Sequence, residues 1–355
     1  MNSEAARVGT IAPARALLVI ALIYATSTAV TALLAQWAGS PFVPWFHDTP
    51  LLLAALLATL FLLGIVWDGS LVLLGLSAQS LRRALHRDNL GGLSVPGVRE
   101  FRFFTCGPAP IAMLLATALA ILGTSNITLL SLELLADTTR WRDPLLWELE
   151  GALLERLAGA GISVGAWDKL YHSAWGIEIV AAFALIVVGR GPRIILHYCV
   201  SMIILFYIGR LLGVINPVMG PAFYRPDVFS YLNGSVSAEA MSLVASVMRN
   251  SSGEALASGG MLLGGVSAMP SLHVAMVAVT AYWLAIAHRW SMLFTVPWVL
   301  LVWASTVVLG WHYIVDGAGG IALGAICIIL TTRMLSGRLG GLARAASDRN
   351  ALPSG

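Results

Sequence analysis

Two short segments of this sequence carry residue types that could do chemistry together. One of them, Gly310-Trp-His312-Tyr-Ile-Val-Asp316, holds a histidine and an aspartate four positions apart, which share one face of a helix. The carboxylate of Asp316 can accept a hydrogen bond from one ring nitrogen of His312, which leaves the other nitrogen as a basic, nucleophilic lone pair. A plain polar cap at a helix end is the alternative explanation of the same spacing.

The other segment, Ser267-Ala-Met-Pro-Ser-Leu-His273, has the residues of a helix start. Pro270 suits a first turn, where unpaired backbone N–H groups point outward and can bind an anion such as phosphate. Ser271 adds a hydroxyl donor, and His273, one turn in, can protonate a leaving oxygen. An ordinary N-cap with a histidine at the membrane interface is the alternative.

The elements that must position these side chains follow from an apolar composition. Of the 355 residues, 58% are hydrophobic and only 11% are charged, and the mean hydropathy is +0.83. A soluble domain carries about 25% charged residues, so lipid must be the outer solvent of this chain. The sequence has no nucleotide-binding glycine loop, zinc-spaced Cys/His set or nucleic-acid-binding stripe. We therefore expect the bilayer as a partner, and neither a nucleic acid nor a metal.

Apolar runs long enough to span about 30 Å of hydrocarbon as helices recur along the chain. They predict an all-α fold, a polytopic membrane helical bundle with about eight transmembrane helices. The expected spans are residues 15–38, 50–80, 104–124, 173–189, 193–215, 270–288, 290–311 and 313–333.

Arginines indicate the orientation of these spans, because positive residues gather in cytoplasmic loops. Alternating spans place every arginine cluster on one side, which we assign to the cytoplasm together with both termini. Both chemical segments then lie at the outer face. The clusters are Arg7 and Arg15; Arg82, Arg83, Arg87, Arg99 and Arg102; Arg190 and Arg193; Arg289; and Arg333, Arg338, Arg344 and Arg349.

The outer side also receives two long connections, 125–172 and 216–268. In the first, Asp143 as an N-cap and Pro144 as the first helical residue predict a helix near 143–158. Its leucines share one face, so we expect a helix lying on the membrane surface; a solvent-exposed helix packed on a neighbouring loop is the alternative. The second connection contains a Gly/Ser-rich stretch, 251–265, which suits a mobile lid or a passive linker.

Some polar residues have both functional and structural explanations. Asp168, Tyr171 and His172 precede the fourth span at the outer face, where they could bind a headgroup or cap the helix, and we favour capping. Asp68 lies near the inner boundary, far from the two segments. We expect it to be a structural hydrogen-bonding residue.

The segments Pro-Ser-Leu-His273 and His312-Tyr-Ile-Val-Asp316 resemble the type 2 phosphatidic acid phosphatase superfamily over roughly 165–330. That superfamily carries a Pro-Ser-x-His motif followed by a Ser-Arg-x5-His-x3-Asp motif. The resemblance implies a six-helix-type core and a reaction through a phosphohistidine without metal or cofactor. By motif position, His312 would be the nucleophile, Asp316 its orienting carboxylate and His273 the acid and base. Ser271 would be a phosphate ligand.

Several positions depart from the phosphatase pattern. Ser305-Thr306 stands where the family has Ser-Arg, and the upstream Lys-x6-Arg-Pro motif is absent. Arg210 and Arg225 are our substitutes for the missing cations, although Arg210 could snorkel to the outer surface and Arg225 could simply be solvated. Together with Ser305 and Tyr224, they complete the expected substrate-binding set.

The Asn-Pro-x-x-Gly-Pro-x-x-Tyr run that ends at Tyr224 is similar to the inositol phosphorylceramide synthase branch. That likeness implies a phosphotransferase that moves a phospho-headgroup, such as inositol phosphate, between lipids. A lipid phosphate or isoprenoid diphosphate phosphatase is the alternative, and a non-catalytic transporter or scaffold is a second one. The substrate partner would be a phospholipid or lipid phosphate, and the oligomeric state is left open.

The expected organisation has three parts. Residues 1–102 form an N-terminal transmembrane extension with a cytoplasmic basic loop, 103–335 form the catalytic core, and 336–355 form a cytoplasmic tail. The chain has one lysine, Lys169, and many arginines, which is typical of a GC-rich bacterial genome. We therefore expect the bacterial inner membrane, with the site at the periplasmic face.

Overall fold

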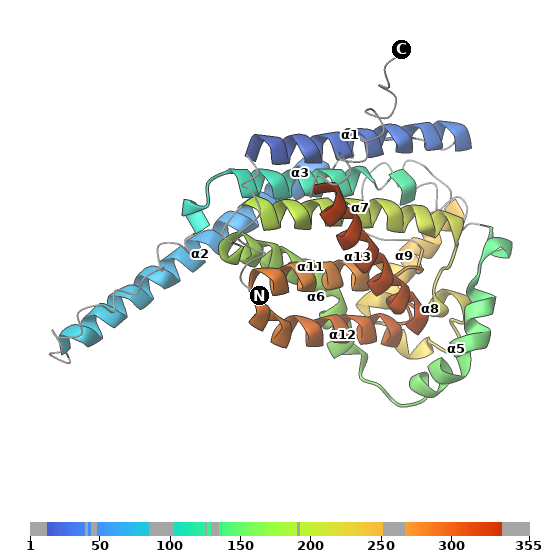
Figure 1. The fold of residues 1–355 in the computed structure, drawn as a ribbon. Helices are drawn as coiled ribbons and strands as arrows, with labels where there is room; N and C mark the ends of the chain where they lie inside the picture. Colours follow the sequence, from blue (N-terminus) through green and yellow to red (C-terminus); the bar gives the residue numbers. More distant parts are fainter. Residues whose placement is uncertain are drawn as a thin grey trace, which may run out of the picture.

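The structure, a computed structural model, describes residues 13–39, 42–43, 48–84, 103–124, 126–128, 135, 137–189, 192–250 and 267–335, and these contain helices without strands. The longer helices are α1 (Pro13–Ala38), α2 (Thr49–Ala84), α3 (Ala109–Gly123), α5 (Asp143–Ala158), α6 (Val164–Val188), α7 (Pro192–Ile215), α9 (Val236–Asn250), α11 (Leu272–Ala287), α12 (Met292–Val308) and α13 (Ile314–Leu335). Shorter pieces are η3 (Phe103–Thr105), η4 (Thr138–Arg140), α8 (Pro221–Tyr224), η5 (Ser230–Leu232) and η6 (Arg289–Ser291). The expected all-α helical bundle is confirmed (Figure 1).

Seven spans within the described residues are long and apolar enough to cross a bilayer: α1, α2, α6, α7, α13, the span Ala109–Thr128 that begins with α3, and the span Arg289–Val308 that joins η6 to α12. The eighth expected span is α11, whose 16 residues rise about 24 Å as a helix, short of about 30 Å of hydrocarbon. It begins after its N-cap, Ser271, and ends before His288, whose backbone is extended. The expected spans therefore correspond to eight helices, of which seven have full length.

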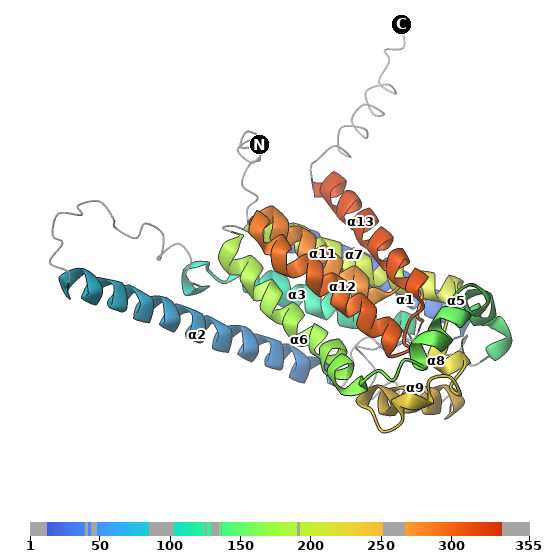
Figure 2. The ribbon, with the colours of Figure 1, turned by 90° about the horizontal axis from the view of Figure 1, so that it is seen from below.

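The centre of the bundle is formed by α7 and α11. Helix α11 packs on α6, α7, α12 and α13, while α7 also contacts α1, α3 and α13. The N-terminal helices join this core from one side, because α1 packs on α3 and α7, and α2 packs on α3 and α6. In Figures 1 and 2, α2 extends well beyond the other helices.

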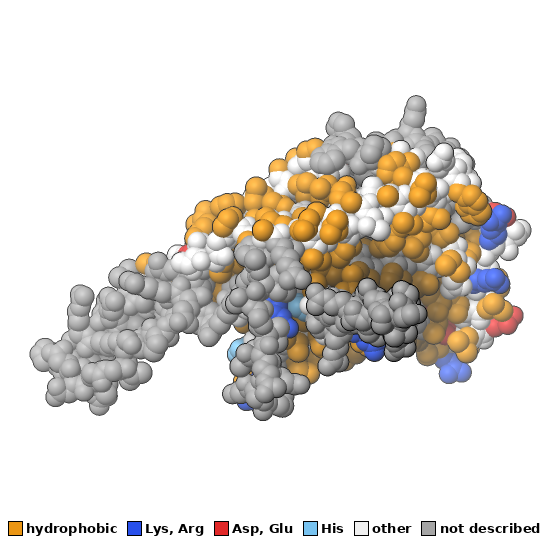
Figure 3. Space-filling model, turned by 45° about the horizontal axis from the view of Figure 1, so that its top comes forward, with side chains coloured by type: hydrophobic (Ala, Val, Ile, Leu, Met, Phe, Trp, Pro, Cys, Tyr) orange, Lys and Arg blue, Asp and Glu red, His pale blue; other side chains and the backbone are white. Residues whose placement is uncertain are grey.

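Three arginines beside helix ends lie at one end of the bundle, and the two chemical segments lie at the other. Arg193 lies in the first turn of α7, Arg289 lies between α11 and α12, and Arg333 lies in the last turn of α13. His273 and His312 lie where α11 and α13 begin, at the opposite ends of these helices. Figure 3 shows hydrophobic side chains over the long face in view, and it shows acidic and basic side chains together at the right-hand end. An apolar long face is what a membrane-embedded bundle requires.

Several sequence-based expectations concern residues outside the described part of the chain. They are the basic loop with Arg87 and Arg99, the Gly/Ser-rich stretch 251–265 and the tail 336–355. Asp68 is described, and its carboxylate accepts hydrogen bonds from the backbone N–H groups of Phe103 (2.8 Å) and Phe104 (3.4 Å). It therefore joins α2 to η3, which is the structural role expected for it.

Helix α5 forms where the sequence predicts a helix, but its start differs from the expectation. Arg142 is the N-cap, and Asp143 is the first helical residue. Instead of capping its own helix, the Asp143 carboxylate accepts hydrogen bonds from Met219 N and Gly220 N, both at 2.9 Å. The N-cap prediction for Asp143 is therefore wrong, because the donors of another loop take up both carboxylate oxygens.

Part of the leucine face of α5 is open. Leu145, Leu149 and Leu153 are 61%, 72% and 53% exposed, and they lie four residues apart on one stripe. The opposite face of α5 packs on the protein through Leu154, which is 1% exposed. A membrane surface against the leucine stripe remains a prediction.

The backbones of α11 and α13 approach closely at Gly320. A Cβ atom placed there would collide with the backbone carbonyl of Ser271, at the start of α11. At the neighbouring Gly319, an added Cβ would be 3.6 Å from the nearest atom, Pro270 Cβ, which is an ordinary contact. The absent side chain of Gly320 thus lets the two helix starts, and the histidines beside them, come together.

We predict that Gly320→Ala lowers thermal stability in detergent, by about 1–3 kcal/mol, because overpacking forces the two helices apart. Its activity should fall as well. Gly319→Ala is the matched control and should resemble the unmodified protein in both assays. Equal melting temperatures for the two variants would contradict close packing at Gly320.

Candidate active site

The loop between α12 and α13 holds His312 in a fixed backbone geometry. The carbonyl of Thr306, in the last turn of α12, accepts hydrogen bonds from Trp311 N (3.0 Å) and His312 N (3.2 Å). Gly310 permits this turn, because its φ of +68° is a conformation that other residues rarely adopt. Gly310 also accepts a hydrogen bond from Ala222 N at 3.0 Å, which ties the loop to α8.

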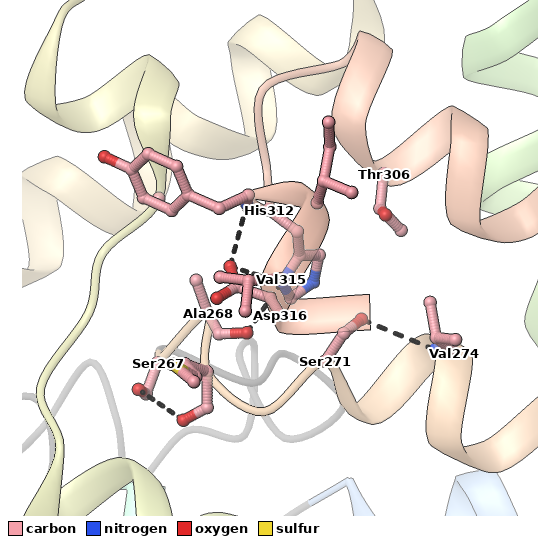
Figure 4. Close-up of polar contacts among 12 residues, drawn as sticks. Ser267, Ala268, Ser271, Val274, Thr306, His312, Val315 and Asp316 are labelled. Carbon is pink, nitrogen blue, oxygen red and sulfur yellow. Dashed lines mark hydrogen bonds and ion pairs between the residues drawn. The ribbon is translucent and has the colours of Figure 1, made fainter. Parts of the chain in front are cut away.

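The ring of His312 is held by a backbone carbonyl. Its Nδ1 lies 2.7 Å from the carbonyl oxygen of Ala268 and 3.6 Å from the nearer carboxylate oxygen of Asp316 (Figure 4). A carbonyl oxygen can only accept, so Nδ1 carries the proton. Nε2 of the neutral ring then has the lone pair. The expected hydrogen bond from His312 to Asp316 is therefore wrong in its partner, because the carbonyl of Ala268 accepts the hydrogen bond from Nδ1.

Asp316 remains close enough to act on the ring by its charge. It is fully buried, and its Oδ2 accepts a hydrogen bond from Tyr313 N at 2.8 Å. Its Oδ1 has no hydrogen-bond partner within the described residues. A buried carboxylate 3.6 Å from Nδ1 would stabilise a positive charge on the ring of His312.

His273 faces His312 from the first turn of α11. The centroids of the two rings are 6.3 Å apart at an interplanar angle of 65°. Two aromatic rings of α6 hold His273 in place: its centroid is 4.6 Å from that of Tyr171 and 6.0 Å from that of Trp175. The structure thus brings together the two histidines that the sequence places 39 positions apart.

Ser271 serves as the N-cap of α11. Its Oγ accepts a hydrogen bond from Val274 N at 3.4 Å, and its backbone N–H donates to the carbonyl of Asp316 at 3.0 Å (Figure 4). Ser271 is fully buried and does not line the cavity described below, so its hydroxyl caps α11, and its role as a phosphate ligand stays a prediction.

A small cavity of about 30 Å³ opens between the two histidines. Arg210 lines it from α7 and is 5% exposed. Its Nη1 donates to the carbonyl of Ile121, at 2.7 Å, and to Thr124 Oγ1, and its guanidinium lies 5.6 Å from the ring centroid of Phe206. A buried cation thus lies in the same cavity wall as both imidazoles.

The remaining members of the expected substrate-binding set lie elsewhere. Arg225 forms a two-point ion pair with Asp227, at 3.0 and 2.7 Å, and lies over the ring of Trp147. The ring centroid of Tyr224 lies 6.1 Å from that of Trp147, and the Ser305 hydroxyl donates to the carbonyl of the residue three positions before it. None of these three side chains lines the cavity.

Two carboxylates of α5 hold the site together, and our sequence analysis did not identify this role. Glu150 accepts hydrogen bonds from Ile314 N (2.6 Å) and Val315 N (2.9 Å), which are unpaired donors at the start of α13. Asp143 binds the loop before α8, and burial raises its pKa to about 6 although its hydrogen bonds act in the opposite direction. The sequence did contain a signal for this role: Asp143 and Glu150 are seven positions apart, which places both acids on one face of the helix.

A further network fixes Trp311, next to His312. Trp311 Nε1 donates to Ser237 Oγ at 3.2 Å, and Ser237 Oγ donates in turn to Asp168 Oδ1 at 2.5 Å. Asp168 also accepts from Val236 N, at the start of α9. Asp168 therefore caps a helix, as favoured, but that helix is α9 instead of its own. Within the described residues, no three His, Cys, Asp or Glu side chains are placed to hold a metal ion.

Comparison with known proteins gives one match. A family model described as the PAP2 superfamily matches residues 146–330, which is just over half of the chain. The matched part runs from α5 to α13 and includes both histidine segments. Searches of curated proteins and of solved structures found no match.

We predict that Glu150→Gln lowers both stability and turnover, because an amide N–H₂ would replace one of two carboxylate oxygens that face backbone donors. A buried donor left unpaired costs about 1–3 kcal/mol. Glu148→Gln, an exposed change on the same helix, is the control and should have little effect. A melting temperature for Glu150→Gln equal to that of the control would argue that the hydrogen bonds from Glu150 to the start of α13 do not stabilise the protein.

Proposed function

Because this chain belongs to the PAP2 superfamily, we propose that it transfers a phospho-headgroup between membrane lipids through a covalent intermediate on His312. Members of that superfamily are phosphatases or phosphotransferases acting on lipid-like phosphates. The observation that carries the proposal is the 2.7 Å contact between His312 Nδ1 and the carbonyl oxygen of Ala268. With its proton on Nδ1 and bonded to the Ala268 carbonyl, the ring offers the Nε2 lone pair as a nucleophile.

In the first step, Nε2 of His312 attacks phosphorus, and the bond from phosphorus to the departing lipid oxygen breaks. Protonated His273 gives its proton to that oxygen, which leaves as a lipid alcohol. His312 now carries the phosphoryl group and a positive ring. Asp316, 3.6 Å from Nδ1, offsets that charge.

In the second step, the hydroxyl of an acceptor lipid attacks the phosphorus of the phosphohistidine. Neutral His273 takes the hydroxyl proton, and the P–N bond breaks, which restores the neutral ring of His312. Arg210 is the cation in the cavity wall and would stabilise the equatorial phosphoryl oxygens in both steps.

The lining of the cavity supports a lipid acceptor over water. Five aromatic side chains contribute to it: Tyr171, Trp175, Phe206, Phe223 and Trp311. An aromatic wall limits access of bulk water and favours an acceptor that arrives with apolar surface of its own. The resemblance of the Asn-Pro-x-x-Gly-Pro-x-x-Tyr run to the inositol phosphorylceramide synthases makes inositol phosphate our candidate headgroup.

We also propose that the site faces the periplasm of a bacterial inner membrane. The argument is the separation between the arginines at one end of the bundle, Arg193, Arg289 and Arg333, and the histidines at the other. The rule that positive residues gather on the cytoplasmic side applies to short loops next to the spans, and Arg193, Arg289 and Arg333 lie beside such helix ends, so the histidines would lie on the outer side.

Substitution of His312 tests its assignment as the nucleophile. His312→Ala should lower turnover by about 10³-fold or more, because both steps require its ring, and the variant should still fold. His288→Ala, which changes an exposed histidine at the far end of α11, should keep full activity. Substantial turnover by folded His312→Ala protein would remove His312 as the nucleophile.

A comparison of Arg210 with Arg225 tests which arginine contacts the phosphate. Arg210→Met should lower kcat by about 10²-fold, the usual effect of removing one preorganised donor to a developing charge. Arg225→Met should have a much smaller effect, because that side chain pairs with Asp227 outside the cavity. The reverse order of the two effects would assign the phosphate contact to Arg225.

The fate of labelled phosphate tests whether the acceptor is a lipid alcohol or water. Phospholipid labelled in its phosphate should yield a second labelled lipid when a lipid alcohol is supplied in vesicles with the purified protein. Release of the label as inorganic phosphate in the presence of that alcohol would instead identify a lipid phosphatase.

A further inference from the structure

A second, larger chamber lies inside the bundle, away from the His273–His312 pair. It has a volume of about 210 Å³, is partly open, and is lined by α2, α3, α6, α7 and α11. Nearly all of its lining is apolar, with Leu53 and Leu56 on α2, Ala118 on α3 and Met202 on α7. Helices α2 and α3 lie outside residues 146–330, so the N-terminal helices of this chain form part of the chamber wall.

The chamber adjoins the active-site cavity. Trp175 on α6 and Phe206 on α7 line both spaces. The same Trp175 ring contacts His273, with centroids 6.0 Å apart. A lipid whose phosphate lay between the two histidines could therefore pass its apolar part along these two rings into the chamber.

One acidic side chain lies in this apolar lining. Glu178 is 8% exposed, and its Oε1 accepts hydrogen bonds from Tyr198 Oη, at 2.8 Å, and from Thr280 Oγ1. Its Oε2 makes no hydrogen bond to any residue that the structure describes. An acid inside a membrane-spanning helix is costly and usually functional, and its second oxygen remains available to an occupant of the chamber that Glu178 lines.

The depth of Glu178 can be estimated from its neighbour on α11. Thr280, which bonds to Glu178, follows His273 by seven residues, a rise of about 10 Å along the helix axis. A group bound by Glu178 therefore lies about 10 Å deeper than the imidazole that serves the phosphate. That separation suits the linkage region of a lipid, between its phosphate and its hydrocarbon chains.

We propose that this chamber binds the hydrocarbon chain of the substrate lipid and that Glu178, as the neutral acid with its proton on Oε2, donates a hydrogen bond to an ester or amide carbonyl of the lipid backbone. The inference rests on the proposed function, since it places the phosphate of the same lipid at His312. It assigns the substrate to the glycerolipid and sphingolipid type. An isoprenoid phosphate has a chain for the chamber but no polar group for Glu178.

The first test is equilibrium binding to His312→Ala protein, so that the result does not depend on turnover. The probe is a diacylglycerol phosphate with palmitoyl chains, compared with its butanoyl counterpart. Ala118→Trp or Leu53→Trp, each of which fills the chamber, should lower the preference for palmitoyl chains about tenfold. Leu51→Trp, an exposed change on α2, should keep that preference. An unchanged preference in both chamber variants, shown to be folded by thermal unfolding, would overturn the proposal.

The second test separates the lipid classes. Glu178→Leu should weaken binding of the palmitoyl diacylglycerol phosphate about tenfold relative to a polyprenyl phosphate, and Glu178→Gln should restore most of that ratio. An equal effect on both lipids would show that Glu178 only supports the fold and would overturn its assignment. If the preference for palmitoyl chains follows the prediction while labelled phospholipid is never turned over, the proposed function is wrong. The assignment of the chamber as a binding site for the hydrocarbon chain is then still supported.

Discussion

The hydrogen bond from His312 Nδ1 to the carbonyl of Ala268 joins the two halves of the site. One partner lies in the loop before α13 and the other in the loop before α11, so this contact of 2.7 Å fixes two helix starts relative to each other. It also selects the tautomer in which Nε2 has the lone pair. Position and reactivity of the nucleophile thus depend on one backbone group, and Asp316 contributes charge without holding the ring.

Most other features of the fold maintain that contact. Gly320 lets α13 lie against the start of α11, and the Glu150 carboxylate binds the first backbone donors of α13. Because the bilayer cannot supply hydrogen bonds to these donors, carboxylates of the extramembrane helix α5 do so. Apolar helices therefore bring the two segments together. The carboxylates of Glu150 and Asp143 on α5 then fix the start of α13 and the loop before α8 by hydrogen bonds.

The sequence was enough to predict the helical bundle and the residues that meet in it. Apolar runs predict the helices of the membrane bundle, and the spacing within the His273 and His312 segments indicates chemistry at two helix starts. Helix α9, in the connection 216–268, was not predicted, because it follows no such run. The role of Ala268 could not be predicted, because it contributes a backbone carbonyl. Every residue has that group, so the residue type gives no signal. Arg225 was expected beside Arg210, but a loop residue has no periodicity from which its direction can be read, and its partner is Asp227.

The central claim is that Nε2 of His312 is the atom that bonds to phosphorus. The most direct measurement is NMR of protein carrying ¹⁵N-labelled histidine, quenched in alkali during turnover of a phospholipid, with detection of the ³¹P–¹⁵N coupling in the His312 peptide. The structure predicts phosphorus on Nε2, with Nδ1 unmodified. Phosphorus on Nδ1, or on a residue other than His312, would contradict the account.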